Sequence, residues 1–453
     1  MAKRSQAQAS FGPAAESPAT TNPDILRCLI VFVPEKQFLF FGPVSRSWNA
    51  AWGQRPKATS FVTPDSSVSQ LQYSLECGFP REKASIGAEL ARLGKLEPLQ
   101  CIVANGCPWH WTICRAAAAE GHLAVLRWAR ESGCPWNAMT CSAAAEGGHL
   151  HVLEWARQND CPWDENTCGR AAGRGNLGVL RWAQHNGCPW DEDTCYEAAF
   201  AGELAVLQWA RENGCPWDEQ TCLAAAGQGH LSVLQWARHN GCPWNENTCH
   251  DAAQAGQLAV LQWARENGCP WNERTCRMAA GWGHLGVLQW ARRNGCPWDE
   301  STCTDAAQAG QLAVLQWARQ NGCPWDERTC RVAAGCGHLV VLQWARQNGC
   351  PWDENTCHDA AEAGDLAVLK WARQNGCSWH DRACASAARA GHLHVLQWAR
   401  QNGCPWSIDD CLSSAAYGRQ PHIQQWIMEN NTPYVRDKDG SFFGSEPYGQ
   451  TGL

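Results

Sequence analysis

The amino-acid sequence predicts an all-α solenoid of about 12–13 helix-turn-helix repeats, with a small helical region at its N-terminal end. The motif Cys-Pro-Trp recurs every 27 residues, almost unchanged and in register, from Cys107 to Cys404, which gives twelve copies. A fixed short period is typical of a chain that stacks one supersecondary unit. Within each copy, as in residues 242–268, the helix punctuation and the apolar pattern indicate two short helices.

The first helix of this copy is expected over Glu246 to Ala255. Pro243 cannot lie inside a helix, Asn245 is a good N-cap, and Gly256 ends the helix. A Cys, two Ala residues and the closing Gly fall at i, i+3, i+4 and i+7, so one face carries only small side chains. Because small residues let helices approach closely, we expect this face to build the stack.

The second helix is expected from Leu258 to about Asn267, with Gly268 in the left-handed conformation that often ends a helix. Its apolar residues include Trp263, and another tryptophan, Trp244, follows the Pro of the repeat. Both recur through almost the whole array, which favours a packing role, because residues repeated in every layer usually serve the stack. Stacking of these rings against carbohydrate or nucleic-acid bases is the alternative interpretation.

A pattern of Thr-Cys-x-x-Ala-Ala, Gly-His-Leu-x-Val-Leu and Asn-Gly extends from Cys107 to about Asn430. It resembles the ankyrin repeat. The repeat has 27 residues, whereas an ankyrin repeat has about 33, and most of the shortening precedes the first helix, where ankyrins carry a projecting hairpin. The resemblance implies a stack with little or no hairpin, which binds a protein partner on its concave, first-helix side.

Charge and hydropathy bound the kinds of partner. The net charge is −7 and the pI is about 6.1, which argues against nucleic acid, because nucleic-acid binding normally needs a basic face. No apolar run approaches the roughly 18 residues of a membrane span, and residues 1–22 lack the apolar core of a signal peptide. We therefore expect a monomer with a protein partner, no nucleic acid and no membrane.

Twenty-four of the 28 cysteines occupy two repeat positions that lie seven residues apart. Successive copies of one position are a layer apart, roughly 8–10 Å, which is too far for a disulfide without movement. We expect buried, reduced thiols, an exposed Cys336, and a cytoplasmic or nuclear location. A disulfide, or a metal site with the recurrent histidine at position 284, stays open as the alternative; we expect no cofactor and no metal.

Residues 23–55 are dense in large apolar side chains and lie outside the repeat. They resemble an F-box, the motif that docks a Skp-type adaptor of cullin-type ubiquitin ligases, although Asn22 replaces the usual Leu and Pro43 falls in the third helix. The matching residues that would dock the adaptor are Pro23, Ile25, Leu26, Leu29, Phe32, Phe38, Leu39 and Trp48. The alternative is that these helices only cap the solenoid.

The other boundaries follow composition. Residues 1–22 are expected to be disordered and 56–77 to form a linker. Residues 78–106 are expected to form a degenerate repeat, 107–430 the ankyrin-like repeats, and 431–453 a flexible tail.

Recognition is expected at the variable residues of the first helices, opposite their small face. Asp251, Asp305 and Asp359 share one such position and alternate with arginine-bearing repeats, which gives a second period of 54 residues. Either these charges pair between neighbouring layers, or they form a ridge for a partner of alternating charge. The predicted partner-binding residues are Tyr196, Phe200, Arg277, Met278, Trp282, Arg331 and Val332.

The sequence holds no Gly-rich phosphate loop, G-x-S-x-G elbow or H-E-x-x-H helix, so we expect no enzyme. It favours a protein-interaction module. One hypothesis is a substrate receptor of a ubiquitin ligase, and the other is an ankyrin-like scaffold with no ubiquitin link.

Overall fold

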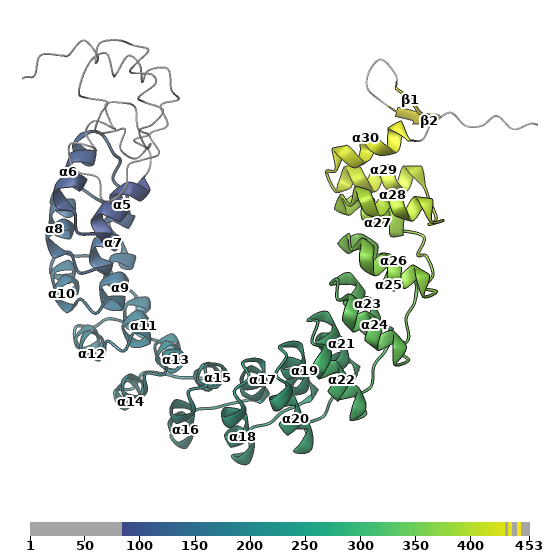
Figure 1. Cartoon of the computed structure of the whole chain (residues 1–453). Helices are drawn as coiled ribbons and strands as arrows, with labels where there is room; N and C mark the ends of the chain where they lie inside the picture. Colours follow the sequence, from purple (N-terminus) through teal and green to yellow (C-terminus); the bar gives the residue numbers. More distant parts are fainter. Residues whose placement is uncertain (1–83, 431–433, 437–441, 445–453) are drawn as a thin grey trace, which may run out of the picture. The chain divides into compact units, whose positions relative to one another are not determined.

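The computed structural model describes residues 84–430, 434–436 and 442–444 of the 453-residue chain. Within these residues the protein has 26 α-helices, α5 to α30, and two short strands. The helices follow one another as thirteen helix-turn-helix pairs (Figure 1). The predicted all-α, ankyrin-like fold is therefore confirmed.

Every pair consists of a first and a second helix. The first helices are α5 Ala84–Arg92, α7 Trp111–Ala119, α9 Ala138–Glu146, α11 Glu165–Gly173, α13 Glu192–Ala201, α15 Glu219–Gly227, α17 Glu246–Gln254, α19 Glu273–Gly281, α21 Glu300–Gln308, α23 Glu327–Gly335, α25 Glu354–Ala363, α27 Ala383–Ala390 and α29 Ile408–Tyr417. The second helices are α6 Leu96–Ala104, α8 Leu123–Glu131, α10 Leu150–Gln158, α12 Leu177–His185, α14 Leu204–Glu212, α16 Leu231–His239, α18 Leu258–Glu266, α20 Leu285–Arg293, α22 Leu312–Gln320, α24 Leu339–Gln347, α26 Leu366–Gln374, α28 Leu393–Gln401 and α30 Pro421–Glu429.

The segments predicted at residues 1–22, 23–55 and 56–77 lie outside the described residues, and so do all eight predicted adaptor-docking residues. Helices α5 and α6 lie in the segment predicted as a degenerate repeat. The described part of the chain contains no helix that is both long and apolar enough to cross a lipid bilayer.

The sequence predicted no regular structure after residue 430, but two strands lie there. Strand β1 (Tyr434–Arg436) pairs antiparallel with β2 (Phe442–Gly444). The residues between them include Asp439-Gly440, a common hairpin turn signal flanked here by β-prone Tyr, Val and Phe. This local signal was missed because the segment has no repeat periodicity.

The chain divides into two compact units. One extends to residue 194 and includes residues 205–215; the other comprises residues 195–204 and the chain from residue 216 onward. In each unit the first helices pack directly on one another, as α7 does on α9 and α17 on α19. The second helices of neighbouring repeats approach less closely, so the first-helix face is the inner face within each unit (Figure 1).

Small and branched side chains fill the core of each repeat. On α17, Cys249, Ala252 and Ala253 are fully buried, and on α18 Val260 and Leu261 are 2% and 0% exposed. These are the faces that the 3.6-residue periodicity predicted. The variable residues of the first helix lie on the opposite side, where some are exposed and others, such as His250 at 3% exposure, are buried between layers.

Side-chain caps and a left-handed glycine define the ends of the first helices. Asn245 Oδ1 accepts a hydrogen bond from the backbone N–H of Asn247 at 3.0 Å. At the other end, Gly256 has a φ of +73°, and a Cβ added there would lie 2.6 Å from the ring of His284 in the next repeat. His284 Nε2 donates to the carbonyl of Gln254 at 3.0 Å. The recurrent histidine thus joins two layers through the backbone.

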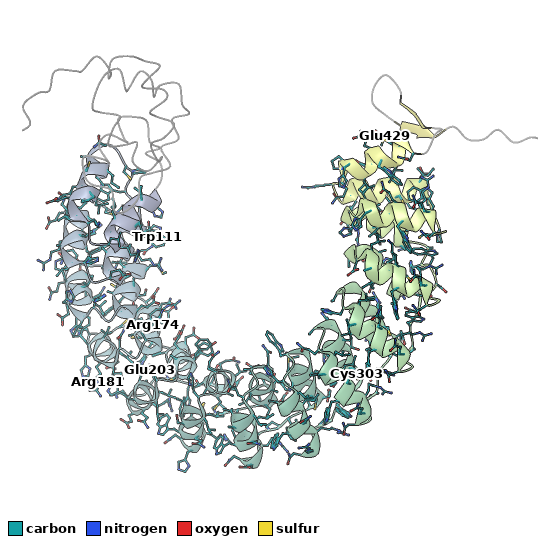
Figure 2. All side chains as sticks on the ribbon, viewed as in Figure 1. Trp111, Arg174, Arg181, Glu203, Cys303 and Glu429 are labelled. Carbon is teal, nitrogen blue, oxygen red and sulfur yellow. The ribbon has the colours of Figure 1, made fainter. Side chains whose placement is uncertain are left out.

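The cysteines of neighbouring repeats meet in pairs that the sequence did not predict. The Cys249 thiol lies within hydrogen-bonding reach of the Cys269 thiol, and Cys276 meets Cys296 in the same way. Cys269 Sγ also donates to the carbonyl of Asn245 at 3.4 Å. The pairing joins two different repeat positions, whereas the expectation of isolated thiols rested on the distance between successive copies of one position. All described cysteines are free thiols, and Cys303, labelled in Figure 2, is fully buried.

The paired tryptophans lie near the turns between repeats. The rings of Trp244 and Trp263 meet edge to face, with centroids 5.8 Å apart. The guanidinium of Arg265 lies 4.1 Å from the ring centroid of Trp271 in the next repeat and also donates to the carbonyl of Cys269. Both kinds of tryptophan are half-buried, so the array holds them by ring stacking and by arginine as well as by burial.

Candidate functional site

The predicted partner-binding residues all lie on first helices or at their ends, but they do not form one cluster. Tyr196 and Phe200 stack on α13 with ring centroids 6.0 Å apart. Met278 lies on α19 and Trp282 is the C-cap residue of that helix. Val332 lies on α23, and α21 lies between α23 and α19. Val332 and Trp282, which were predicted to cluster, are therefore separated by one repeat.

Trp282 is the most exposed of these residues. Its side chain is 61% exposed, whereas Phe200 is 44% exposed and Met278 is half-buried. The same repeat position, six residues after the first-helix cysteine, holds alanine in both neighbouring layers, at Ala255 and Ala309. The indole therefore stands between two small side chains.

Three other large apolar residues of the described chain are exposed but were not predicted as binding residues: Met139, which is 41% exposed, Val340 and Tyr417. Tyr417 is 83% exposed and occupies the repeat position of Trp282, in the last repeat. Val340, on α24, is 63% exposed. Cys336 occupies the Trp282 position two repeats further along and is exposed, as predicted. A comparison of this one position through all repeats would have found Tyr417, but the last repeat departs from the pattern around it.

The alternating charges pair between neighbouring layers. Arg277 Nε lies 3.0 Å from Asp305 Oδ2, and Arg331 Nε lies 2.6 Å from Asp359 Oδ2. This is one of the two arrangements that the sequence left open. Arg277 and Arg331 therefore already contact carboxylates of their own array, which leaves less of each guanidinium for a partner.

The 54-residue period also has a packing cause. A Cβ added to Gly281 would lie 3.4 Å from the Cβ of Asp305, and one added to Gly335 would lie 3.3 Å from that of Asp359. Asp305 and Asp359 thus each lie over a glycine of the preceding repeat, where a larger side chain would crowd the aspartate. Arginine and glycine in one repeat, with aspartate in the next, form a matched pair.

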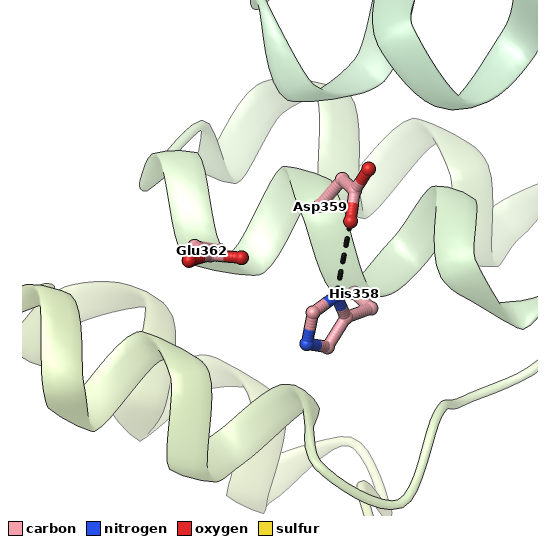
Figure 3. A group of neighbouring side chains, drawn as sticks. All are labelled: His358, Asp359 and Glu362. Atoms are coloured by element: carbon pink, nitrogen blue, oxygen red, sulfur yellow. Dashed lines mark hydrogen bonds and ion pairs between the residues drawn. The ribbon is translucent and has the colours of Figure 1, made fainter. Parts of the chain in front are cut away.

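One polar cluster of the described residues brings three potential metal ligands together. On α25, ligand atoms of His358, Asp359 and Glu362 lie within 4.8 Å of one another (Figure 3). His358 Nδ1 is 3.0 Å from Asp359 Oδ1, and its Nε2 is 2.9 Å from the hydroxyl of Ser386. The cluster combines the ligand types of a zinc or other transition-metal site.

The charges around this cluster do not fit a cation. Arg331 contacts Asp359, and Arg389 contacts Glu362, so each carboxylate already has a guanidinium partner. Burial acts to raise the pKa of Asp359, but the hydrogen bonds from His358 and Arg331 outweigh it and hold that pKa below its ordinary value. The arrangement is an ion-pair network that joins α23, α25 and α27.

Comparisons with known proteins give no family. No protein-family model matches the chain. No curated protein matches it. Among solved structures, the pentatricopeptide repeat protein PPR10 in complex with an 18-nt psaJ RNA element is 14% identical, with a TM-score of 0.37, over 90% of this chain and 73% of that one. The human ASB11 ankyrin repeat domain is 17% identical, with a TM-score of 0.35, over 41% of this chain and 99% of that one.

These likenesses are too distant to transfer a ligand or the role of any residue, but they correct one expectation. From the net charge we expected no nucleic acid, whereas the pentatricopeptide repeat protein PPR10, matched over 90% of this chain, is in complex with RNA. The physical reason for the error is that a net charge of −7 describes the whole chain and not one face. The second helices repeat an arginine near their ends in most layers, which the net charge conceals. The exclusion is withdrawn.

Proposed function

We propose that the repeats form a protein-binding array whose first-helix face contacts the partner, with Trp282 as the anchor. The observation that supports this proposal most directly is the exposed indole of Trp282 between two alanine-bearing layers. Large aromatic side chains are enriched among residues that dominate binding energy, whereas an exposed indole contributes little to a stack. Met278, one turn earlier on α19, adds apolar surface beside it.

The test is partner capture with a matched pair of tryptophan variants. Full-length protein, Trp282→Ala and Trp263→Ala would be used as bait after nuclease treatment, so that capture through RNA is removed. Partners recovered by the wild type should be lost with Trp282→Ala, whose helical circular dichroism and melting temperature should match the wild type. Recovery of the same partners by a folded Trp282→Ala protein would contradict the proposal. Partners lost on nuclease treatment alone would assign the surface to RNA.

We also propose, more specifically, that residues 23–55 dock a Skp-type adaptor and that the array binds the substrates of a ubiquitin ligase. Its support is the F-box-like sequence of that segment. A version that lacks residues 1–60 should lose the adaptor and keep the Trp282-dependent partners. If purified adaptor binds neither the full chain nor the shortened one, the ligase form is wrong and the scaffold form stands.

A further inference from the structure

Three repeats in the second unit carry an aspartate at the same position, but only two of these aspartates receive an arginine from the preceding repeat. Asp305 and Asp359 each accept a hydrogen bond from an arginine in the preceding repeat, Arg277 and Arg331 respectively. Asp251 occupies the same position on α17. The residue that corresponds to the arginine there is Leu223, on α15.

The Asp251 carboxylate lies over a glycine, as those of Asp305 and Asp359 do, but no arginine of the preceding repeat is bonded to it. A Cβ added to Gly227 would lie 3.5 Å from Asp251 Cβ and 3.9 Å from Oδ2, so this side chain lies over a glycine as Asp305 and Asp359 do. In the part of the chain that the structure describes, its carboxylate makes no hydrogen bond or ion pair. Asp251 is half-buried, and leaving a carboxylate partly desolvated without a partner is unfavourable.

The direction of the pKa shift of Asp251 agrees with this geometry. Burial raises its pKa above the ordinary aspartate value, although the charges of His250 and Arg274 lower it in part. Asp359, in the filled version of the same setting, has a lowered pKa, because His358 and Arg331 stabilise its charge. The two carboxylates thus differ as expected when one accepts hydrogen bonds from a histidine and an arginine and the other accepts none from the described residues.

We infer that Asp251 is a docking site for an arginine side chain of a protein partner, which takes the place that Arg277 and Arg331 occupy in the two filled repeats. This inference rests on the proposed function and names the chemistry of its partner. Leu223 is half-buried and offers apolar surface to the aliphatic part of the incoming side chain. Trp282, on the next first helix, would receive a neighbouring apolar residue of the same partner segment.

The filled repeats favour arginine over lysine. In both of them the nitrogen that meets the carboxylate is Nε, which belongs to the planar guanidinium and leaves the terminal nitrogens free for further bonds. A lysine ammonium would reach the carboxylate only as a point charge. The partner segment is therefore expected to present an arginine close to an aromatic or aliphatic residue.

The test uses full-length protein and a displayed library of random 12-residue peptides. Peptides that bind the wild type and fail to bind Trp282→Ala would be sequenced, synthesised and titrated. They should contain arginine, and Asp251→Asn should weaken them about 10-fold to 100-fold, as expected for a charge-assisted hydrogen bond. Leu223→Arg should block them to a similar extent, because it supplies the missing cation from within the array. Asp305→Asn is the matched control and should change peptide affinity less than about twofold.

Changing the peptide separates this inference from the proposed function. Replacing its arginine with citrulline should reduce binding as much as Asp251→Asn does, and the two changes together should cost little more than either alone. Peptides that need Trp282 but bind Asp251→Asn and Leu223→Arg as well as the wild type would overturn the arginine site and leave the proposed function intact. If no peptide depends on Trp282, the proposed function fails and the arginine site fails with it.

Discussion

Tryptophan and arginine each occur in two regions of this molecule, and the comparison shows how repeat position decides their role. Near the turns between repeats, Trp244 meets Trp263, and Arg265 covers Trp271, so every ring has a partner within the array. On the first-helix face, Trp282 is the only tryptophan at its repeat position, and the neighbouring layers carry alanine there. A side chain repeated in every layer satisfies the stack, whereas one that occurs in a single layer is available to a partner.

The largest expected contrast is between Trp263→Ala and Trp282→Ala. Removing Trp263 takes an aromatic partner from Trp244 and leaves a cavity at the turn, which should lower the free energy of unfolding by about 2–4 kcal/mol. Removing the exposed Trp282 should change it by less than about 0.5 kcal/mol. Urea unfolding followed by circular dichroism measures both. Equal losses would mean that Trp282 also packs in the stack, and the two regions would then not differ.

Arginine sharpens the same comparison. Arg265→Ala removes a guanidinium that stacks on Trp271 and donates to a backbone carbonyl, and should cost about 1–2 kcal/mol of stability. Arg277→Ala breaks a partly exposed ion pair with Asp305 and should cost less than about 1 kcal/mol. Raising the salt concentration should reduce the effect of Arg277→Ala and leave most of that of Arg265→Ala. A stronger salt dependence for Arg265 would argue that its stacking on tryptophan contributes little.

The two aspartates of opposite pKa shift should respond oppositely to pH. The lowered pKa of Asp359 stabilises the fold at neutral pH, and this contribution should disappear as the pH falls through its folded pKa, so Asp359→Asn should matter least in acid. The raised pKa of Asp251 means that its charge is unfavourable in the fold. Asp251→Asn should therefore stabilise the protein slightly at neutral pH, and this gain should vanish below the pKa of the unfolded chain. Thermal unfolding of both variants between about pH 3 and 7 gives the sign, and the same slope for both would contradict the assignment.

The smallest effect concerns Cys336, the exposed thiol at the repeat position of Trp282. Cys336 lies at the Trp282 position of a later repeat, so it should react with a maleimide well before the buried thiols, and Cys336→Ser should leave stability unchanged. The hydrogen bond with the Cys269 thiol, followed by burial, raises the pKa of Cys249, which makes this thiol slow to react in the native protein. Mass spectrometry after short labelling separates them. A partner bound over the first-helix face should protect Cys336 from the maleimide. Rapid labelling of buried paired thiols, such as Cys249, would contradict their burial in the native protein.

The fold could be predicted because its signals are local and repeated. Pro243, the cap at Asn245 and the glycine at 256 mark the helix ends in one copy, and the period of 27 residues extends them through the array. The buried face followed from spacing alone. The hairpin after residue 430 occurs once, so no repetition reinforced its signal.

The site could be predicted only in part, because it depends on distances between layers. Two arrangements of the alternating charges were compatible with the sequence. The structure selects pairing, which needs the offset between layers that places Arg277 beside Asp305. The same offset brings Cys249 to Cys269, a pairing that no comparison within one repeat position reveals. The sequence shows the same aspartate at Asp251, Asp305 and Asp359. Only the contacts between layers show that Asp251 lacks the arginine that the other two have.

The matched layers of arginine, glycine and aspartate also bear on how a chain of near-identical units finds its register. Were a repeat to stack on the wrong neighbour, most caps, thiol contacts and apolar contacts would still form, because every layer carries them. A slip by one unit would set Asp305 against Gln254 and His250 in place of Gly281 and Arg277, which crowds the aspartate and removes its cation. A slip by two units toward the C-terminal end would set Asp305 against Gly335 and Arg331, which restores the match. The alternation therefore makes the pair of repeats the unit that can be gained, lost or exchanged without penalty: excising residues 269–322 should leave a well-packed array, whereas excising residues 269–295 should leave a mismatched junction.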